Sequence, residues 1–302
     1  MKRQNILTLA MVLLLTGAFL PVEAQVGDVL DGAYIREHVP KREPVPLQTI
    51  READAMYSKR ILREIDMRQK INHPLYFPLQ PVDYPEGKQP GRKRVNFTYL
   101  VYNIGALNPS EAQRKPMFEF DPKDFTNWYR KPIPIDDTMA RKDVLTYSEE
   151  AREIDTLTGQ MINVTKQRSI NKRDIQSIIL WEEWVFDKQR SVMDVRIIAM
   201  APVAKYQDVS GQEFTERLFW IYYPHYRDLF ANHEVFNTYN DAERKTFDDI
   251  FLKRRFESHV LIESNVYDNR FVRDYLMGID AMLEGKRIEE ELFQYEHDLW
   301  EY

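Results

Sequence analysis

The sequence contains no cysteine. Without thiols the chain forms no disulfide framework, holds no thiolate zinc site and offers no cysteine nucleophile. The same absence removes the lipid-modified cysteine through which bacterial lipoproteins are anchored. We therefore expect any membrane contact of the processed chain to come only through partners.

Glycine is also scarce, with 10 residues among 302. No glycine-rich loop of the kind that cradles phosphate occurs, and no serine has the glycine flanks of a nucleophile elbow. None of the six histidines stands at the spacing of a helical zinc pair. His225 and His233, beside Glu234, come nearest to a cluster, although a packed or capping histidine is the commoner case.

Paired carboxylates give no convergent acid–base site either. Glu182 and Glu183 are neighbours in an expected strand, so their side chains point to opposite faces. Asp248 and Asp249 fall on an expected helix, where we interpret them as a solvated face. The sequence therefore predicts no catalytic, metal-binding or cofactor-binding residue, and hence no enzyme.

Long apolar runs are missing beyond the first segment. Lys2 and Arg3 precede an apolar stretch from Ile6 to Leu20, and Val22-Glu23-Ala24 follows it. This pattern is typical of a secretory signal, predicted as residues 1–24, and the stretch is too short to span a bilayer comfortably. An uncleaved anchor is the alternative. A net charge of −6 leaves no basic surface for nucleic acid.

Residues 25–48 are expected to form an extended arm. Pro40, Pro44 and Pro46 remove backbone donors and favour extended geometry. The arm carries scattered apolar side chains, of which four are candidate partner-binding residues: Tyr34, Ile35, Val45 and Leu47. It lies either on another protein or on its own domain, and the sequence leaves both open.

Residues 49–302 are expected to form a single α+β domain. Thr49 and Glu52 have the spacing of a capping box, which predicts a helix ending before Pro74. Its apolar stripe would be Ile50, Ala53, Tyr57, Ile61 and Ile65, spaced by three and four. A shorter helix is expected over 95–107. The region 108–173 is expected to be rich in loops, with one hairpin near Thr158-Gly159.

The second half has clearer periodicity. Runs of β-branched and aromatic residues over 178–187, 191–204 and 214–223 predict an antiparallel meander. Helices are expected over 240–256, capped by Asn240, and over two apolar stripes that Gly285 separates. The predicted fold is therefore α+β: an antiparallel β-meander covered by helices, with an extended N-terminal arm and helix.

Charge is divided unevenly along the chain. Residues 41–94 carry 12 basic and 7 acidic residues, whereas 257–302 carry 4 basic and 12 acidic. The two parts either pack together within one chain or form complementary faces of a head-to-tail assembly. Six further candidate partner-binding residues follow from the second alternative: Arg60, Arg63, Arg68, Glu289, Glu290 and Glu291.

Several long blocks resemble the GldN/PorN family, in the same order along nearly the whole processed chain. They are Asp31-Gly32-Ala33-Tyr34, Arg51-Glu52-Ala53-Asp54, the run from Lys70 to Tyr76, the run from Asp187 to Ile197, His233-Glu234-Val235-Phe236-Asn237, Thr246-Phe247-Asp248-Asp249-Ile250-Phe251, Glu263-Ser264-Asn265-Val266-Tyr267-Asp268 and Glu296-His297-Asp298-Leu299-Trp300-Glu301.

The resemblance implies a role and no reaction. It implies a periplasmic structural component of the type IX secretion system of Bacteroidota, which also powers gliding in some members. The partners it implies are an outer-membrane lipoprotein of the GldK/PorK type, other copies in a ring, and the force-transmitting GldM/PorM protein. The location it implies is the inner face of the outer membrane.

Two other function classes stay open. An exported hydrolase would need a convergent nucleophile or metal cluster, which the residues do not provide. A carbohydrate- or peptidoglycan-binding module would explain the aromatic residues of the second half if they lay exposed on one flat face. The residues concerned are Trp181, Trp184, Trp220, Tyr222 and Tyr223.

Overall fold

A computed structural model describes most of the chain, in seven ranges: 41–83, 93–119, 132–154, 161–207, 211–240, 243–266 and 269–298. The predicted signal segment, Tyr34 and Ile35 lie outside these residues. The described residues belong to one compact unit.

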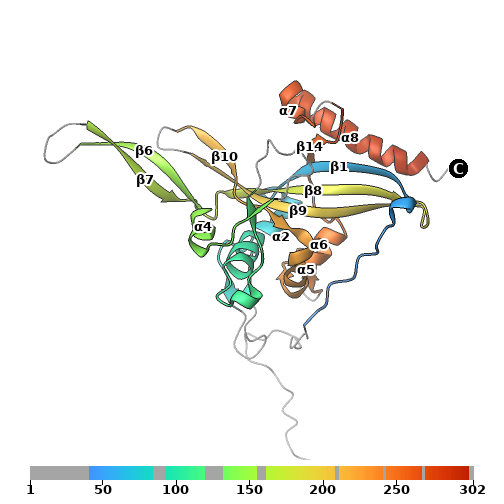
Figure 1. The fold of residues 1–302 in the computed structure, drawn as a ribbon, viewed down its shortest axis with the longest axis horizontal. Coiled ribbons are helices and arrows are strands. Elements are labelled where there is room, and N and C mark those ends of the chain that lie inside the picture. The colour runs from blue at the N-terminus through green and yellow to red at the C-terminus, as the bar shows by residue number, and fades with distance from the viewer. Residues whose placement is uncertain are drawn as a thin grey trace, which may run out of the picture. The chain divides into compact units, whose positions relative to one another are not determined.

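The centre of the fold is a six-stranded antiparallel sheet in the order β10-β9-β8-β1-β14, with β11 paired to β9 (Figure 1). The strands are β1 (Ala55–Asp66), β8 (Ile175–Asp187), β9 (Val192–Gln207), β10 (Glu213–Arg217), β11 (Ile221–Tyr222) and β14 (His259–Glu263). The predicted antiparallel arrangement is confirmed, including the turn at 188–190 between β8 and β9, but the third run, expected over 214–223, is divided into β10 and β11, and Tyr223 starts a helix.

The predicted first helix is wrong, because residues 55–66 form strand β1 between β8 and β14. Tyr57, Ile61 and Ile65 are spaced by four residues, and four is a multiple of the two-residue period of a strand as well as close to a helical turn. Neighbours Ile61, Leu62 and Arg63 are all buried, as expected of a strand covered on both faces. No side chain caps the short 3₁₀ turn η2 (Glu52–Asp54).

Four two-stranded sheets accompany the central one. They are β2 (Val82–Asp83) with β3 (Lys93–Arg94), β4 (Phe118–Glu119) with β5 (Ile133–Pro134), β6 (Thr146–Ile154) with β7 (Met161–Ser169), and β12 (Glu234–Val235) with β13 (Lys245–Thr246). The β6–β7 pair is a regular antiparallel hairpin, so the region 108–173 is more ordered than predicted. Its expected turn at Thr158-Gly159 lies outside the described residues.

The helices surround this sheet. They are α2 (His73–Tyr76), α3 (Phe97–Tyr99), α4 (Thr138–Asp143), α5 (Tyr223–Asn232), α6 (Phe247–Leu252), α7 (Val272–Tyr275) and α8 (Ile279–Asp298), together with a π-helical segment η4 (Leu100–Ala106) and the 3₁₀ turns η3 (Lys70–Asn72) and η5 (Glu111–Gln113). The shorter helix predicted over 95–107 corresponds to α3 and η4.

Three details of the helix prediction are wrong. The helix expected over 240–256 is only α6, and its capping box consists of Thr246 and Asp249 instead of Asn240 and Glu243. Helix α5, with Pro224 in its first turn, was not predicted. Gly285 does not separate two helices, since α8 runs through it.

The main hydrophobic core lies where α3, α5 and α6 pack together against the sheet. Aromatic rings dominate it: the ring of Phe230 lies 5.6–6.3 Å from those of Phe97, Tyr223, Phe247 and Phe251. In the π-helical segment, a β-carbon added at Gly105 would lie 2.7 Å from the ring of Tyr226. Only a residue without a side chain permits that approach.

A second, smaller cluster holds α8 against β14 and β1, at the β14 edge of the sheet, whereas α5 packs on β9 and β11 (Figure 1). Ile61, Val260, Ile288 and Leu292 are its buried centre. A β-carbon at Gly285 would lie 3.3 Å from the carbonyl oxygen of Val260, so this glycine lets the helix approach the backbone of the edge strand.

Candidate functional site

The predicted arginine surface does not form one face. Arg60 and Arg63 lie on β1, whereas Arg68 follows the strand in a turn. The Nε of Arg60 lies 3.1 Å from a carboxylate oxygen of Glu183 on β8. Arg68 pairs with Asp66 at 2.8 Å. Each arginine therefore has an acidic partner of its own within the chain.

Arg63 brings together the two predicted charged groups within one chain. Its side chain is buried; its Nε donates to Ser258 Oγ at 2.9 Å and a terminal nitrogen donates to Glu289 of α8. Glu290 is exposed, and Glu291 pairs with Arg287 on its own helix. The Arg63–Glu289 contact is thus intramolecular, and a charge reversal at Arg63 would test folding before it tested assembly.

The carboxylates of Glu182 and Glu183 also accept hydrogen bonds from neighbouring side chains. Glu182, fully buried, accepts two hydrogen bonds from Arg254 at 2.7 and 3.2 Å and one from the Trp184 ring nitrogen. Its neighbour Glu183 faces Arg60, so the expectation of opposite directions is confirmed. A carboxylate with this many donors is a structural group.

Asp248 does not belong to a solvated face, contrary to the prediction. It is 5% exposed and accepts hydrogen bonds from Arg227 at 3.1 and 3.2 Å and from Tyr223 Oη at 2.9 Å. Burial, with the adjacent charge of Asp248, raises the pKa of Tyr223. This triad joins α5 to α6 inside the main core.

The two histidines nearest to a cluster have structural contacts. The ring of His225 packs edge-to-face on Tyr222, with centroids 4.8 Å apart. The Nδ1 of His233 lies 2.9 Å from the backbone oxygen of Leu229. Across the described ranges no group of three histidine, aspartate or glutamate side chains is placed to hold a metal ion.

Glu64 is the strongest electrostatic anomaly on the sheet. It lies on β1, with His259 Nε2 3.4 Å away on β14 and Lys205 Nζ 3.2 Å away on β9. Burial alone would raise the pKa of this carboxyl, but the hydrogen bond with His259 and the charge of Lys205 outweigh it and lower the pKa to about 2. Glu64 is therefore charged at neutral pH and ties three strands together.

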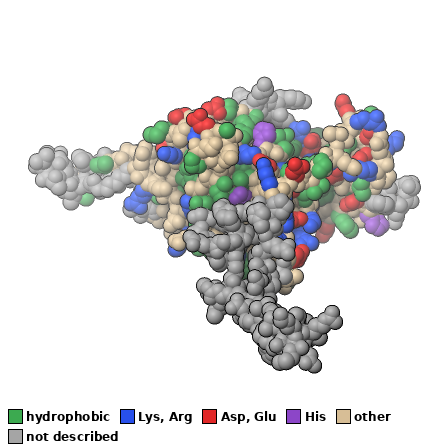
Figure 2. Space-filling model, turned by 90° about the horizontal axis from the view of Figure 1, so that it is seen from below, with side chains coloured by type: hydrophobic (Ala, Val, Ile, Leu, Met, Phe, Trp, Pro, Cys, Tyr) green, Lys and Arg blue, Asp and Glu red, His purple; other side chains and the backbone are tan. Residues whose placement is uncertain are grey.

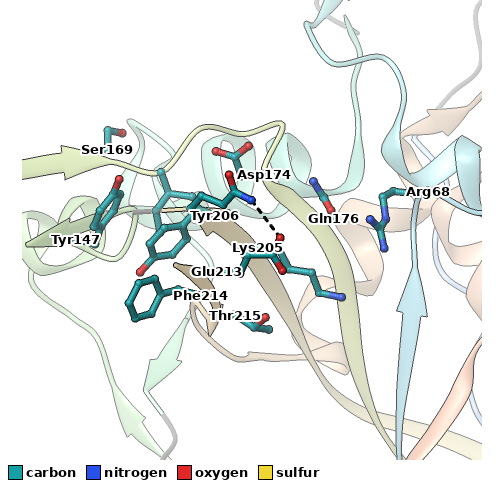
Figure 3. A pocket seen from close by; sticks show the side chains of 12 residues that line it. Arg68, Tyr147, Ser169, Asp174, Gln176, Lys205, Tyr206, Glu213, Phe214 and Thr215 are labelled. Carbon is teal, nitrogen blue, oxygen red and sulfur yellow. Dashed lines mark hydrogen bonds between the residues drawn. The ribbon is translucent and has the colours of Figure 1, made fainter. Parts of the chain in front are cut away.

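A cleft of about 520 Å³ opens between the base of the β6–β7 hairpin and the β9–β10 hairpin. Figure 3 shows Tyr147, Tyr206 and Phe214 along one wall; Tyr206 stacks on both others, with centroid distances of 4.5 and 5.8 Å. Polar side chains face the same space: Arg68, Ser169, Asp174, Gln176, Lys205, Gln207, Glu213 and Thr215.

The aromatic residues proposed for a flat binding face do not form one. Trp220 and Tyr223 are buried at 5% and 1% exposure, and Trp181 and Trp184 are partly covered. Tyr222 alone among the five counts as exposed. Apart from Tyr222, these side chains are wholly or partly buried, so the five residues form no exposed aromatic platform.

Residues 42–48 form an extended strap, tied down at both ends. Asn232 of α5 exchanges two hydrogen bonds of 2.9 Å with the backbone of Arg42, and Arg196 of β9 donates to the backbone oxygen of Gln48 at 2.7 Å. Between these ties, Val45 is 66% exposed and Leu47 38% exposed. The strap therefore presents apolar side chains outward.

The C-terminal helix presents a larger apolar surface. On α8, Ile279, Met282, Leu283 and Phe293 are each more than half exposed, and Met277 lies exposed just before the helix. Figure 2 shows a different face of the molecule, seen from the side away from α8, and acidic and basic side chains are mixed there. Of the two apolar stripes predicted here, Ile288 and Leu292 of the second are buried, whereas Ile279 and Leu283 of the first lie on this exposed face.

No helix of the described part combines the length and apolar character needed to cross a bilayer. No curated protein matched the chain in a sequence comparison. The family model described as gliding motility associated protein GldN matches residues 50–301, which is most of the chain. That family comprises structural components of gliding motility and secretion. The chain therefore belongs to the GldN family and is associated with gliding motility and type IX secretion.

Proposed function

We propose that this protein is a non-enzymatic structural component of the type IX secretion system in the periplasm. In this role it assembles with an outer-membrane lipoprotein of the GldK/PorK type into a ring at the inner face of the outer membrane, and it contacts the GldM/PorM-type protein that transmits force. Family membership and the predicted signal segment support this assignment.

The observation that carries the proposal is the distribution of polar and apolar groups. The buried charged groups described above each have a partner of opposite charge. Glu182 pairs with Arg254, Arg63 with Glu289, and Asp248 with Arg227. Exposed apolar side chains, in contrast, gather on the strap and on α8. Clustered apolar surface of this kind marks binding to other macromolecules.

The strap is the surface we assign to the lipoprotein partner. A pre-ordered extended segment binds with less loss of conformational freedom than a disordered one. Its two ties, to α5 and to β9, hold Val45 and Leu47 in a fixed outward direction. The remaining candidates of the arm, Tyr34 and Ile35, would extend the same contact.

Affinity purification of the tagged protein from its native envelope tests the proposal. The unchanged protein is expected to retain the lipoprotein, and the double substitution Val45→Glu with Leu47→Glu to lose it. Val266→Glu is the matched control, because Val266 is 89% exposed elsewhere on the surface. Retention of the lipoprotein by the double variant would refute the strap assignment, and absence of all secretion components from the wild-type eluate would refute the function.

Binding of glycan is the second candidate function, and the cleft is the feature that favours it. A ring such as Phe214, 40% exposed beside carboxylate and amide side chains, matches the apolar face and hydroxyl rim of a sugar. Sedimentation with purified peptidoglycan tests this. Pelleting that is lost in Phe214→Ala would support it, and no pelleting of the wild type would exclude it.

A further inference from the structure

Helix α8 has a buried inner face and an exposed outer face, and both are apolar. Its inner face, with Gly285, Ile288 and Leu292, is buried against β14 and β1. Its outer face carries Ile279 at 75%, Leu283 at 58% and Phe293 at 69% exposure. Burying one such side chain is worth about 1.5–3 kcal/mol, so an outer face of this kind is costly to leave in water.

The outer residues follow the spacing of a coiled coil. Ile279, Leu283, Lys286, Glu290, Phe293 and His297 succeed each other by four, three, four, three and four residues. We name these six residues the outer seam. Alternate steps of four and three are the seam of a heptad repeat, which packs against a second helix.

The charges within the outer seam select the orientation of that second helix. If a copy of α8 runs antiparallel, with a two-fold axis level with Ile288, Lys286 meets Glu290 of the second copy and Glu290 meets its Lys286. The same register places Leu283 against Phe293, again twice. A parallel pair would instead place lysine against lysine and glutamate against glutamate, which is repulsive.

We propose that the outer seam binds the outer seam of a second copy of this chain, antiparallel and related by a two-fold axis. This inference rests on the proposed function, since it specifies one contact by which copies associate in the secretion assembly. A two-fold contact uses the same patch on both partners and differs from the head-to-tail contact that closes a ring. It would therefore join two rings or two neighbouring complexes.

The contact is small. From Leu283 to Phe293 the helix rises about 15 Å, so the buried area lies at the low end of specific interfaces. The purified dimer is accordingly expected to dissociate at roughly micromolar concentration. In a large assembly the same contact is repeated, and repetition raises its effective strength.

Charge exchange is the first test, read by analytical ultracentrifugation of the purified processed protein across a concentration series. Lys286→Glu or Glu290→Lys alone places like charges in both central layers and is expected to weaken dimerisation about tenfold. The double exchange, Lys286→Glu with Glu290→Lys, restores the opposite charges and should recover wild-type affinity. Both residues are exposed, so thermal unfolding of the monomer serves as the folding control.

Disulfide mapping is the second test, and the absence of native cysteine makes it clean. A mixture of Lys286→Cys and Glu290→Cys proteins is expected to cross-link to a heterodimer under mild oxidation. Either variant alone should cross-link at least severalfold less, because the antiparallel register offsets equivalent residues. Arg51→Cys, on a residue exposed elsewhere, measures random collision.

The outcomes separate this inference from the function it rests on. A monomer at all concentrations, a parallel cross-linking pattern, or a failure of the double exchange to restore dimerisation each overturns the antiparallel pair. If in such a case the protein still purifies with the secretion components, the proposed function stands without it. If neither association occurs, both fail.

Discussion

The two lateral sides of the sheet, that of β9 with α5 and α6 and that of β14 with α8, are built differently. The side of α5 and α6 carries an aromatic core with a buried Arg227–Asp248 pair, whereas the side of α8 carries a small cluster around Ile61 and Ile288. The stability of a small domain scales with its buried apolar surface. The cluster at α5 and α6 therefore contributes most of the free energy of unfolding, and the cluster at α8 mainly fixes that helix to the sheet. The comparison teaches that, of these two regions, the one whose helix has the larger exposed apolar face also has the smaller buried cluster.

Breaking the buried triad should have the largest effect. Asp248→Ala leaves Arg227 buried without its partner and Tyr223 without its acceptor, and is expected to lower the free energy of unfolding by about 3–5 kcal/mol. Lys253→Ala, which breaks an exposed pair with Asp249, is the control and should cost less than 1 kcal/mol or so. Chemical denaturation measures both. Equal, small losses would mean that the core does not depend on the triad.

Detaching α8 is the next largest change. Gly285→Val would press a branched side chain on the backbone of Val260, and we expect about 1–3 kcal/mol of local destabilisation. Hydrogen exchange should then speed up in α8 and leave α5 and α6 unchanged. Met282→Val introduces the same residue at an exposed position of the same helix and should change little. Uniform acceleration across the chain would show that the two sides unfold as one unit.

The acid sensitivity of the protein tests the contacts of Glu64, which join β1 to β9 and β14. Glu64 has a folded-state pKa of about 2, below its ordinary 4.5, so its stabilisation is full above pH 4.5 and is lost as pH falls through 2. Glu64→Gln is expected to cost about 1–3 kcal/mol at neutral pH and to flatten that acid limb. A denaturation series from pH 7 to 2 measures it. An unchanged acid limb in the variant would contradict the assignment.

The smallest effect is expected at the sheet surface. Arg60→Gln removes the pair with Glu183, of which both side chains are about one-third exposed. Such pairs contribute about 0.2–1 kcal/mol. The native complex should keep its size in this variant unless Arg60 also contacts a partner, as the charge distribution along the sequence predicts. Sedimentation of the wild-type and variant complexes distinguishes these results.

The sequence predicted an element correctly where its apolar pattern fitted only a helix or only a strand. It was misleading where the pattern fitted both. The runs of β8 and β9 are rich in β-branched and aromatic residues and were predicted as strands with the correct turn. Tyr57, Ile61 and Ile65 satisfied both periods, so the position of β1 between β8 and β14 decided the outcome. Asp248 was misjudged for a different reason, because its partner Arg227 lies on a helix that local pattern did not predict.

The candidate partner-binding residues divide in the same way. The extended conformation of the strap followed from its prolines, but the exposure of Val45 and Leu47 did not, because the arm could also have packed on its own domain. The partner of Arg63 did not follow from sequence, since the acidic run at 289–291 offered three candidates and only packing places Glu289 beside it. The outer seam required knowing first which face of α8 is buried.

The contact of Gly105 with Tyr226 has a consequence for sequence variation. A side chain at 105 would overlap a ring buried in the core, so a mutation there is tolerated only in a chain that already has a smaller residue at 226. In that order, the smaller residue at 226 first leaves a cavity, which a larger residue at 105 then fills. The two positions should therefore vary together among homologues, and each order of mutation passes through an intermediate of lower fitness.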